Sequence, residues 1–395
     1  MIPKRSDNLF LESIRLRNLL SYGPEAEEIP LGPLNVLIGP NGSGKSNLLE
    51  GISLLQAAPK DLMVPIRGGG GALDWLHKSS GEIPTASIEA VIRHPKFSRP
   101  IRYRLKFTAQ GQRFALIDEA VENRDVDQGD AEPHFFFKYE GNQPFINVQE
   151  ERRQLRREDI DPEQSILSQR KDPDQYPEIT HLGEAFAKIK IYREWPLGRN
   201  TAPRLPQKPD LPNDFLLENA ENLGLVLSNL RRNSQAKRKI LESLAEINED
   251  IQDFEASVEA GTVQVFLDEG RFTIPATRMS EGTLRYLCLL SILVHPNPPA
   301  LICIEEPEMC LHPDMFPTLA ALLIEASTRT QIIVTTHSDA LIDALSDHPE
   351  TILVCEKHQG QTSMKGLNKD SLSDWLDTYT LGQLWRRGDL GGNRW

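Results

Sequence analysis

The stretch that decides the fold lies near the beginning of the sequence: the apolar run Leu34–Ile38, then Gly39-Pro-Asn-Gly-Ser-Gly-Lys-Ser46, then the helical pattern of Asn47–Leu55. A short apolar run of this kind is typical of a buried strand. A strand followed by GxxxxGK[ST] and a helix is the context of the phosphate-binding P-loop, or Walker A motif. The sequence therefore predicts a nucleotide site at this point of the chain.

The residue types in this loop fit the chemistry of phosphate binding. Glycines let the backbone wrap so closely that successive N–H groups point at phosphate oxygens, and the N-terminus of the next helix adds partial positive charge. The Lys45 ammonium would reach the β- and γ-phosphates, and the Ser46 hydroxyl would hold Mg²⁺. The expected nucleotide-binding residues are Gly39, Pro40, Asn41, Gly42, Ser43, Gly44, Lys45, Ser46 and Asn47.

Two further apolar runs end in residues that a nucleotide hydrolase needs. Ala300–Ile304 leads into Glu305 and Glu306. In such an acidic pair one carboxylate can order Mg²⁺, and the other can polarise a water beside the γ-phosphate. Gln331–Thr336 leads into His337, which would face the ligand crevice at the carboxyl end of a strand in a parallel sheet.

A fourth motif precedes the acidic pair. Ser280 and Gly282 lie in Arg278–Arg285, directly before the apolar helical stretch Tyr286–Val294. A serine at this place caps the helix, and the helix N-terminus attracts anions. By itself the pattern is that of an ordinary helix cap, so its interest lies in its position among the other motifs.

In this order the four motifs resemble the ABC-type ATPase heads of SMC, RecF and related proteins. The sequence more closely resembles the OLD/RecF-like group of AAA-family "predicted ATPases", whose relatives include anti-phage defence proteins. The likeness covers about residues 1–60 and 270–395 and rests on Ile38–Asn47, Glu305–Pro313, Thr335–Ser338, Tyr379–Trp385 and Gly388–Trp395. It implies an α/β fold, a P-loop NTPase of the ABC-ATPase head type with an antiparallel β lobe and a helical or irregular insertion.

The resemblance also implies a head-to-tail homodimer that sandwiches ATP and Mg²⁺ between the P-loop of one chain and the signature of the other. By position, Ser280 and Gly282 would reach the γ-phosphate of the opposite subunit, and Leu311–Asp314 would cross the interface.

The same resemblance assigns the catalytic roles. Glu306 would be the water-activating base and His337 the switch residue, while Glu305 and Ser46 would hold the metal. Family members usually have Asp where this chain has Glu305, which leaves the division of roles between Glu305 and Glu306 open. Glu308 is expected to cap or pair. No Q-loop glutamine can be assigned among Gln56, Gln110 and Gln112.

Composition limits the class of protein. The 395 residues carry a formal net charge of −13, which excludes a surface that is basic throughout, as a general nucleic-acid binder would have. No apolar run is long enough for a membrane span and the first residues lack a signal-peptide pattern, so we expect a cytoplasmic protein without membrane contact. Reduced, buried thiols are expected at the four cysteines, because each lies in or beside an apolar run: Cys288, Cys303, Cys310 and Cys355.

We expect three parts in the chain: residues 1–120 as the first part of the head, 121–262 as an insertion, and 263–395 as the second part. Strands and hairpins are predicted across 61–130, a plain loop at Arg67–Gly71, and an irregular, linker-like segment across 120–215 that includes Glu150–Arg157. A hairpin is predicted from Val263–Leu267 and Arg271–Ile274. A helical arm, packed on the head or in a dimer contact, is indicated by the heptad spacing of Ile240, Leu244, Ile247, Ile251, Phe254 and Val258.

Two basic clusters leave DNA contact open, because solvated faces and a DNA groove both fit them. They consist of Arg93, Lys96, Arg99, Arg102, Arg104 and Lys106, and of Arg231, Arg232, Lys237, Arg238 and Lys239.

The sequence therefore favours an ATPase that couples its ATP state to DNA or to an effector such as a nuclease encoded nearby. An ATP-gated scaffold with little turnover is the alternative. A small-molecule kinase would leave three of the four motifs unexplained.

Overall fold

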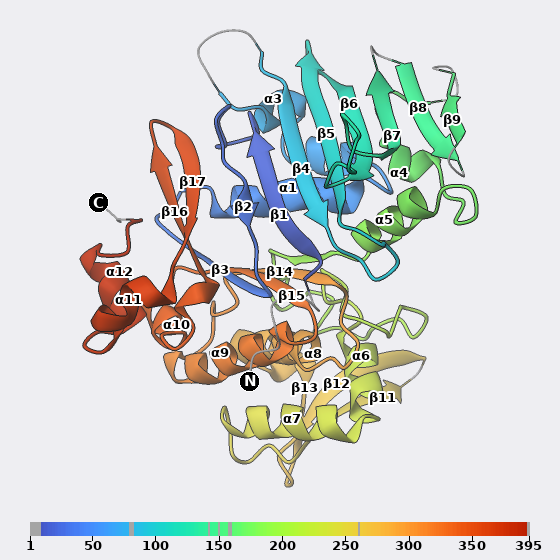
Figure 1. Ribbon diagram of the computed structural model, residues 1–395. Helices are drawn as coiled ribbons and strands as arrows, with labels where there is room; N and C mark the ends of the chain where they lie inside the picture. Colours follow the sequence, from blue (N-terminus) through green and yellow to red (C-terminus); the bar gives the residue numbers. More distant parts are fainter. Residues whose placement is uncertain are drawn as a thin grey trace. The chain divides into compact units, whose positions relative to one another are not determined.

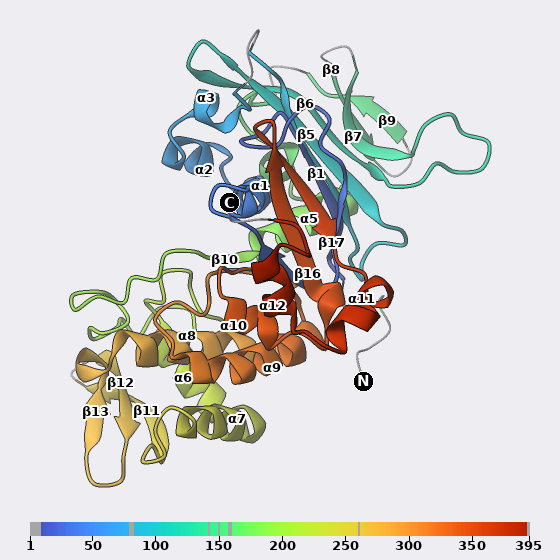
Figure 2. The same ribbon diagram turned by 90° about the vertical axis from the view of Figure 1, so that its left-hand side faces the viewer.

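The computed structural model describes residues 9–78, 83–140, 143–148, 151–156, 160–259 and 261–392. The chain forms two compact units, each built from segments distant in sequence. We call residues 9–190, 351–367 and 390–392 the P-loop unit, and residues 191–350 and 368–389 the signature unit. Both contain helices and strands, as the predicted α/β class requires (Figures 1 and 2).

An antiparallel sheet dominates the P-loop unit. It confirms the expected β lobe, and β5 alternates buried and half-buried residues as a half-solvated strand should. Its turn to β6 contains Gly111 with a φ of 64°. In sheet order the strands are β2 (Ile29–Pro30), β1 (Leu11–Arg17), β4 (Ala86–Ile92), β5 (Ile101–Gln110), β6 (Arg113–Asn123), β7 (Phe135–Glu140), β8 (Gln143–Val148) and β9 (Glu151–Gln154).

Helices cover one face of this sheet (Figure 1). Phe186 on α5 packs edge-on against Tyr103 of β5 and Phe10. Gly51 on α1 lies against Leu16 of β1, where an added Cβ would come within 2.9 Å. The helices are α1 (Lys45–Ala57), α2 (Met63–Gly68), α3 (Ala72–Trp75), α4 (Ile166–Gln169) and α5 (Pro177–Ala187).

The P-loop itself extends from a second group of strands in the same unit. β3 (Leu34–Ile38) is fully buried and runs parallel to β16 (Ile352–His358), with Val36 opposite Ile352. β16 then forms a hairpin with β17 (Gln361–Gly366). The predicted strand and helix on either side of the P-loop, β3 and α1, are both present.

The signature unit contains the other predicted strands. β14 (Leu301–Glu305) and β15 (Gln331–Thr335) are parallel neighbours with Glu305 opposite Thr335, and β10 (Lys190–Tyr192) lies beside β14. A separate sheet, β11 (Asp253–Glu259), β12 (Thr262–Asp268) and β13 (Thr273–Pro275), contains the predicted hairpin. The helices are α6 (Leu223–Arg231), α7 (Ser234–Ala245), α8 (Glu281–Leu293), α9 (Phe316–Ser327), α10 (Asp339–Asp343), α11 (Lys369–Leu376) and α12 (Leu381–Arg387).

The predicted helical arm over 240–258 is wrong in its second half. Helix α7 ends at Ala245, and Phe254 and Val258 belong to strand β11, where Phe254 pairs with Leu267. Phe254 and Val258 are four residues apart, a spacing that fits a strand's period of two as well as a heptad. In the strand Phe254 is buried, whereas Val258 is exposed.

Three smaller expectations also need correction. The segment 120–215 is not irregular throughout, since it contains β7, β8, β9, α4, α5 and β10, while residues 150 and 157 lie outside the described residues. Arg67 and Gly68 end helix α2 instead of lying in a loop. Cys310 is exposed, whereas the other three cysteines are buried as expected. Within the described ranges no helix is both long and apolar enough to cross a membrane.

Candidate nucleotide-binding and catalytic site

Two glycines of the P-loop sit where no side chain fits. Gly39 has a φ of 150°, and a Cβ there would lie 2.3 Å from the carbonyl oxygen of Cys355. Gly44 has a φ of 105°, and its Cβ would lie 2.2 Å from Thr362 Oγ1. Strand β16 and hairpin strand β17 therefore impose glycine at both positions and shape the loop from behind.

The loop is also held from within. The buried Lys45 Nζ donates to the carbonyl oxygens of Gly39, at 2.9 Å, and Pro40, at 3.1 Å. Thr362 Oγ1 donates to Ser43 O at 2.7 Å. The hydroxyl of Ser43 is buried and meets no hydrogen-bond partner in the described part of the chain. A lysine and an orphaned hydroxyl in a loop with these glycines are donors that fit phosphate oxygens.

The acidic pair and the histidine come together in the signature unit. Glu306 N donates to Thr335 O at 3.0 Å, which fixes the residue at the end of the parallel pair β14–β15. The carboxylate of Glu306 lies 3.6 Å from His337 Nε2, with each side chain about one-third exposed. Glu306 has a φ of 46°, which is left-handed and costly for a residue with a side chain. Such strain is typical of functional positions.

Glu308 holds the histidine segment, as the sequence analysis expected of a capping residue. Its Oε1 accepts hydrogen bonds from Thr336 Oγ1 and, at 3.3 Å, from His337 N. Its Oε2 is buried without a partner in the described structure, and burial raises the pKa of this carboxyl. Glu308 thus fixes the backbone around His337.

The signature residues begin helix α8 as predicted. Ser280 Oγ caps the helix by accepting from Thr283 N at 3.0 Å. Gly282 packs on the segment that follows the acidic pair, because a Cβ there would lie 2.5 Å from Cys310 O. The signature and the segment after β14 are therefore in direct contact within one chain.

Arg285 has a role that its motif does not predict. Its buried guanidinium donates from Nη2 to Glu306 O at 2.6 Å and approaches Glu305 O at 3.5 Å. The same group lies 5.2 Å from the Trp195 ring centroid. Arg285 closes the S-x-G-x-x-R pattern, and the available signal is an arginine directly before the apolar stretch Tyr286–Val294.

The remaining candidates are placed as follows. Asn47 Nδ2 donates to Ser21 Oγ at 2.7 Å. Gln56 Nε2 donates to Ile189 O at 2.7 Å, while Gln110 and Gln112 are exposed at the β5–β6 turn. The candidate site residues 39–47 all belong to the P-loop unit. The candidate site residues of the signature unit are Ser280, Gly282, Glu305, Glu306 and His337.

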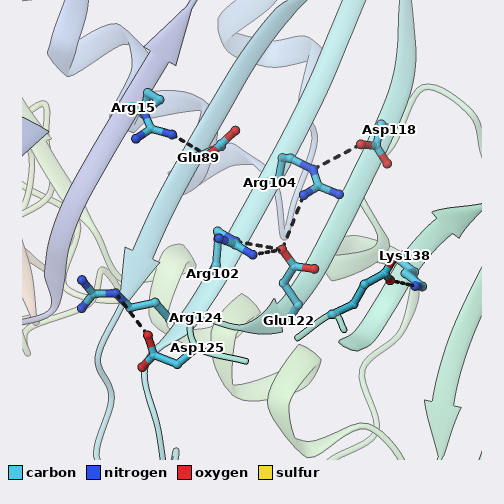
Figure 3. A network of polar contacts seen from close by, with 10 residues as sticks. Arg15, Glu89, Arg102, Arg104, Asp118, Glu122, Arg124, Asp125 and Lys138 are labelled. Carbon is cyan, nitrogen blue, oxygen red and sulfur yellow. Dashed lines mark hydrogen bonds and ion pairs between the residues drawn. The ribbon is translucent and has the colours of Figure 1, made fainter. Parts of the chain in front are cut away.

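Acidic side chains neutralise most of the first basic cluster. Figure 3 shows a network across β1, β4, β5 and β6 in which Arg102 pairs with Glu122, and Arg104 pairs with both Asp118 and Glu122. Arg93, Arg99 and Lys106 also pair with carboxylates. The second cluster is paired in the same way at Arg231, Lys237, Arg238 and Lys239. Some carboxylates are shared between two cations, as Asp118 is by Arg104 and Lys106 and Asp253 is by Arg231 and Lys237.

Comparison with known proteins gives a family match over most of the chain. A family model described as "AAA domain, putative AbiEii toxin, Type IV TA system" matches residues 34–343. None of the curated proteins matches the sequence.

Solved structures with the same fold include SMC heads. A structure of an Smc head bound to the C-winged helix domain of ScpA has a TM-score of 0.59 at 14% identity, covering 92% of this chain and 99% of that one. An Smc head with an extended coiled coil from Pyrococcus furiosus, bound to the C-terminal domain of ScpA, has a TM-score of 0.60 at 13% identity, covering 93% and 98%. A third, from Pyrococcus yayanosii, has a TM-score of 0.53 at 12% identity, covering 93% and 99%. The predicted fold class, a P-loop head of the ABC type, is confirmed.

Proposed function

The chain belongs to the AAA-domain family whose model matches residues 34–343, and we propose that it is an ABC-type ATPase that binds ATP with Mg²⁺ and hydrolyses it. One observation carries the proposal. A P-loop whose glycines are imposed by their surroundings occurs in the same chain as a Glu306–His337 pair held at the ends of parallel strands.

The residues of this chain would share the work as follows. The N–H groups of the P-loop and the Lys45 ammonium bind and orient the phosphates. Ser46 and Glu305 would hold Mg²⁺, which would offset the negative charge of the phosphates. Glu306 accepts a proton from the attacking water. His337, which lies beside Glu306, orients the γ-phosphate.

We further propose that two copies close head to tail around ATP. The support is that Ser280 is exposed at the N-terminus of the 13-residue helix α8, a place that attracts anions. A second copy would thus supply Ser280 and Gly282 to the phosphates bound by the first P-loop.

The partner that reads the ATP state is then proposed to be a protein. Most cations of both basic clusters already have carboxylate partners within the chain, so we favour a protein effector such as a nuclease encoded nearby over DNA. Two similar Smc heads are each bound to a domain of another protein, ScpA. A cytoplasmic location and a place in anti-phage defence belong to the same proposal.

The test is steady-state ATP hydrolysis together with binding of a fluorescent ATP analogue, for the unaltered protein and two variants. Lys45→Ala should lose nucleotide binding. Glu306→Gln should bind nucleotide yet hydrolyse it slower by about 100-fold or more, the usual loss with a general base.

Glu350→Gln is the matched control, because Glu350 lies 3.3 Å from His348 as Glu306 lies near His337, outside the predicted motifs. Its hydrolysis should be unchanged. Nucleotide binding without hydrolysis by the unaltered protein would favour the scaffold alternative, and the absence of both would contradict the proposal.

A further inference from the structure

The last described residues of the chain return to the P-loop. Residues 390–392 belong to the P-loop unit, although residues 368–389 belong to the signature unit. Gly391 and Gly392 have φ values of 80° and 65°. Gly392 N donates to Glu356 Oε1, on strand β16, at 2.6 Å.

Gly392 lies directly beside the first glycine of the P-loop. A Cβ on Gly392 would lie 3.0 Å from Val354 Cγ1, 3.6 Å from Cys355 O and 3.7 Å from Gly39 Cα. The carbonyl oxygen of Cys355 is also the atom that leaves no room for a side chain at Gly39. Gly39 and Gly392 therefore pack around the same backbone group of β16.

Glu356 is the side chain that holds this arrangement. Besides the bond from Gly392, its Oε2 lies 3.1 Å from His358 Nε2. A Cβ on Gly391 would come within 2.7 Å of Glu356 Oε1, so the glycine permits the close approach. The Gly392 bond, with help from His358, lowers the pKa of the Glu356 carboxyl, so a charged acceptor receives the backbone N–H.

We propose that Glu356 is a positioning residue for nucleotide binding, because it holds Gly391 and Gly392 against Gly39 and so fixes the entrance of the P-loop. The inference rests on the proposed ATP site. Gly39 directly follows β3 and begins the loop. Its carbonyl oxygen accepts a hydrogen bond from the Lys45 ammonium at 2.9 Å. A shift of Gly39 would move the ammonium, whereas a fixed Gly39 lowers the ordering cost of binding.

The experiment measures the Kd of a fluorescent ATP analogue with Mg²⁺, the KM and kcat of hydrolysis, and the unfolding midpoint without nucleotide. Glu356→Ala removes the charged acceptor of the Gly392 N–H, and Gly392→Ala places a Cβ 3.0 Å from Val354 Cγ1 at a φ of 65°. Both should raise Kd and KM about tenfold, the scale of one hydrogen bond to a charged group, and leave kcat within about twofold. Glu356→Gln should largely restore binding, because its amide oxygen can still accept from Gly392 N.

Two matched controls separate this role from general stability. Glu350→Ala removes a carboxylate that also pairs with a histidine two residues away. Gly360→Ala places a side chain at a φ of 83° where no described atom lies within 4 Å of the Cβ. Both should leave Kd unchanged.

The outcomes are distinct. If the unaltered protein binds no ATP, the proposed function fails and this inference falls with it. If it binds ATP and Glu356→Ala binds equally well, only the positioning role is wrong. A rise in Kd that the two controls reproduce, or that follows a matching fall in the unfolding midpoint, would reduce Glu356 to a structural residue and contradict the proposal.

Discussion

At the scale of single residues, the guanidinium of Arg285 joins the start of α8 to the backbone that carries both site glutamates. Arg285→Ala would leave the carbonyl of Glu306 without this donor and remove a buried group. We expect the free energy of unfolding to fall by about 2 kcal/mol. Hydrolysis should fall about tenfold or more while nucleotide affinity changes little, because displacement of a catalytic group mainly lowers kcat.

Denaturant unfolding and the KM–kcat split measure these effects. Arg278→Ala is the control, since Arg278 is an exposed arginine seven residues earlier in the same motif. An Arg285→Ala protein with unaltered kcat would show that the link to Glu306 is not needed for hydrolysis.

At the scale of elements, a buried carboxylate ties strand β6 to helix α4. Glu119 accepts hydrogen bonds from Tyr103 Oη at 2.7 Å, Ser165 Oγ at 2.5 Å and Ile166 N at 2.8 Å. Burial raises its pKa to about 7, against these bonds, which act to lower it. The Glu119 carboxyl therefore binds its proton more tightly in the folded protein than in the unfolded chain.

Because its pKa is raised, protonated Glu119 stabilises the folded state at low pH. This stabilisation falls as pH rises between the ordinary carboxyl pKa and about 7. Between pH 5 and 7.5 the unaltered protein should lose about 2 kcal/mol of unfolding free energy relative to Glu119→Gln. Urea unfolding of both proteins at the two pH values measures the difference. A difference that stays constant with pH would contradict a titrating Glu119.

The elements also show what sequence reasoning can reach. The P-loop, β14, β15 and α8 were predictable because each motif is local: apolar strand, turn residues and helix follow one another in sequence. The predicted helical arm extends beyond the end of α7, because the spacing of Phe254 and Val258 fits both a helix and a strand. Only the pairing of β11 with β12 decides between the two. Arg285 and Glu356 acquire their contacts through folding of distant segments, which spacing along the chain does not encode.

At the scale of the whole molecule, acidic residues outnumber basic ones and give a net charge of −13. Some of these acidic residues form ion pairs with the two basic clusters. Carboxylates pair with most of the arginines and lysines that the sequence groups together, as Figure 3 shows for Arg102 and Arg104. The proposed molecule is therefore a nucleotide switch that closes on a second copy of itself and acts on a protein.

The mass of the Glu306→Gln protein in solution, with and without ATP and Mg²⁺, tests this account most directly. Slowed hydrolysis should trap the closed state, so light scattering should show the monomer mass without nucleotide and twice that mass with ATP. Lys45→Ala should remain at the monomer mass in both conditions. A Glu306→Gln protein that binds ATP and keeps the same mass would contradict the ATP-closed dimer.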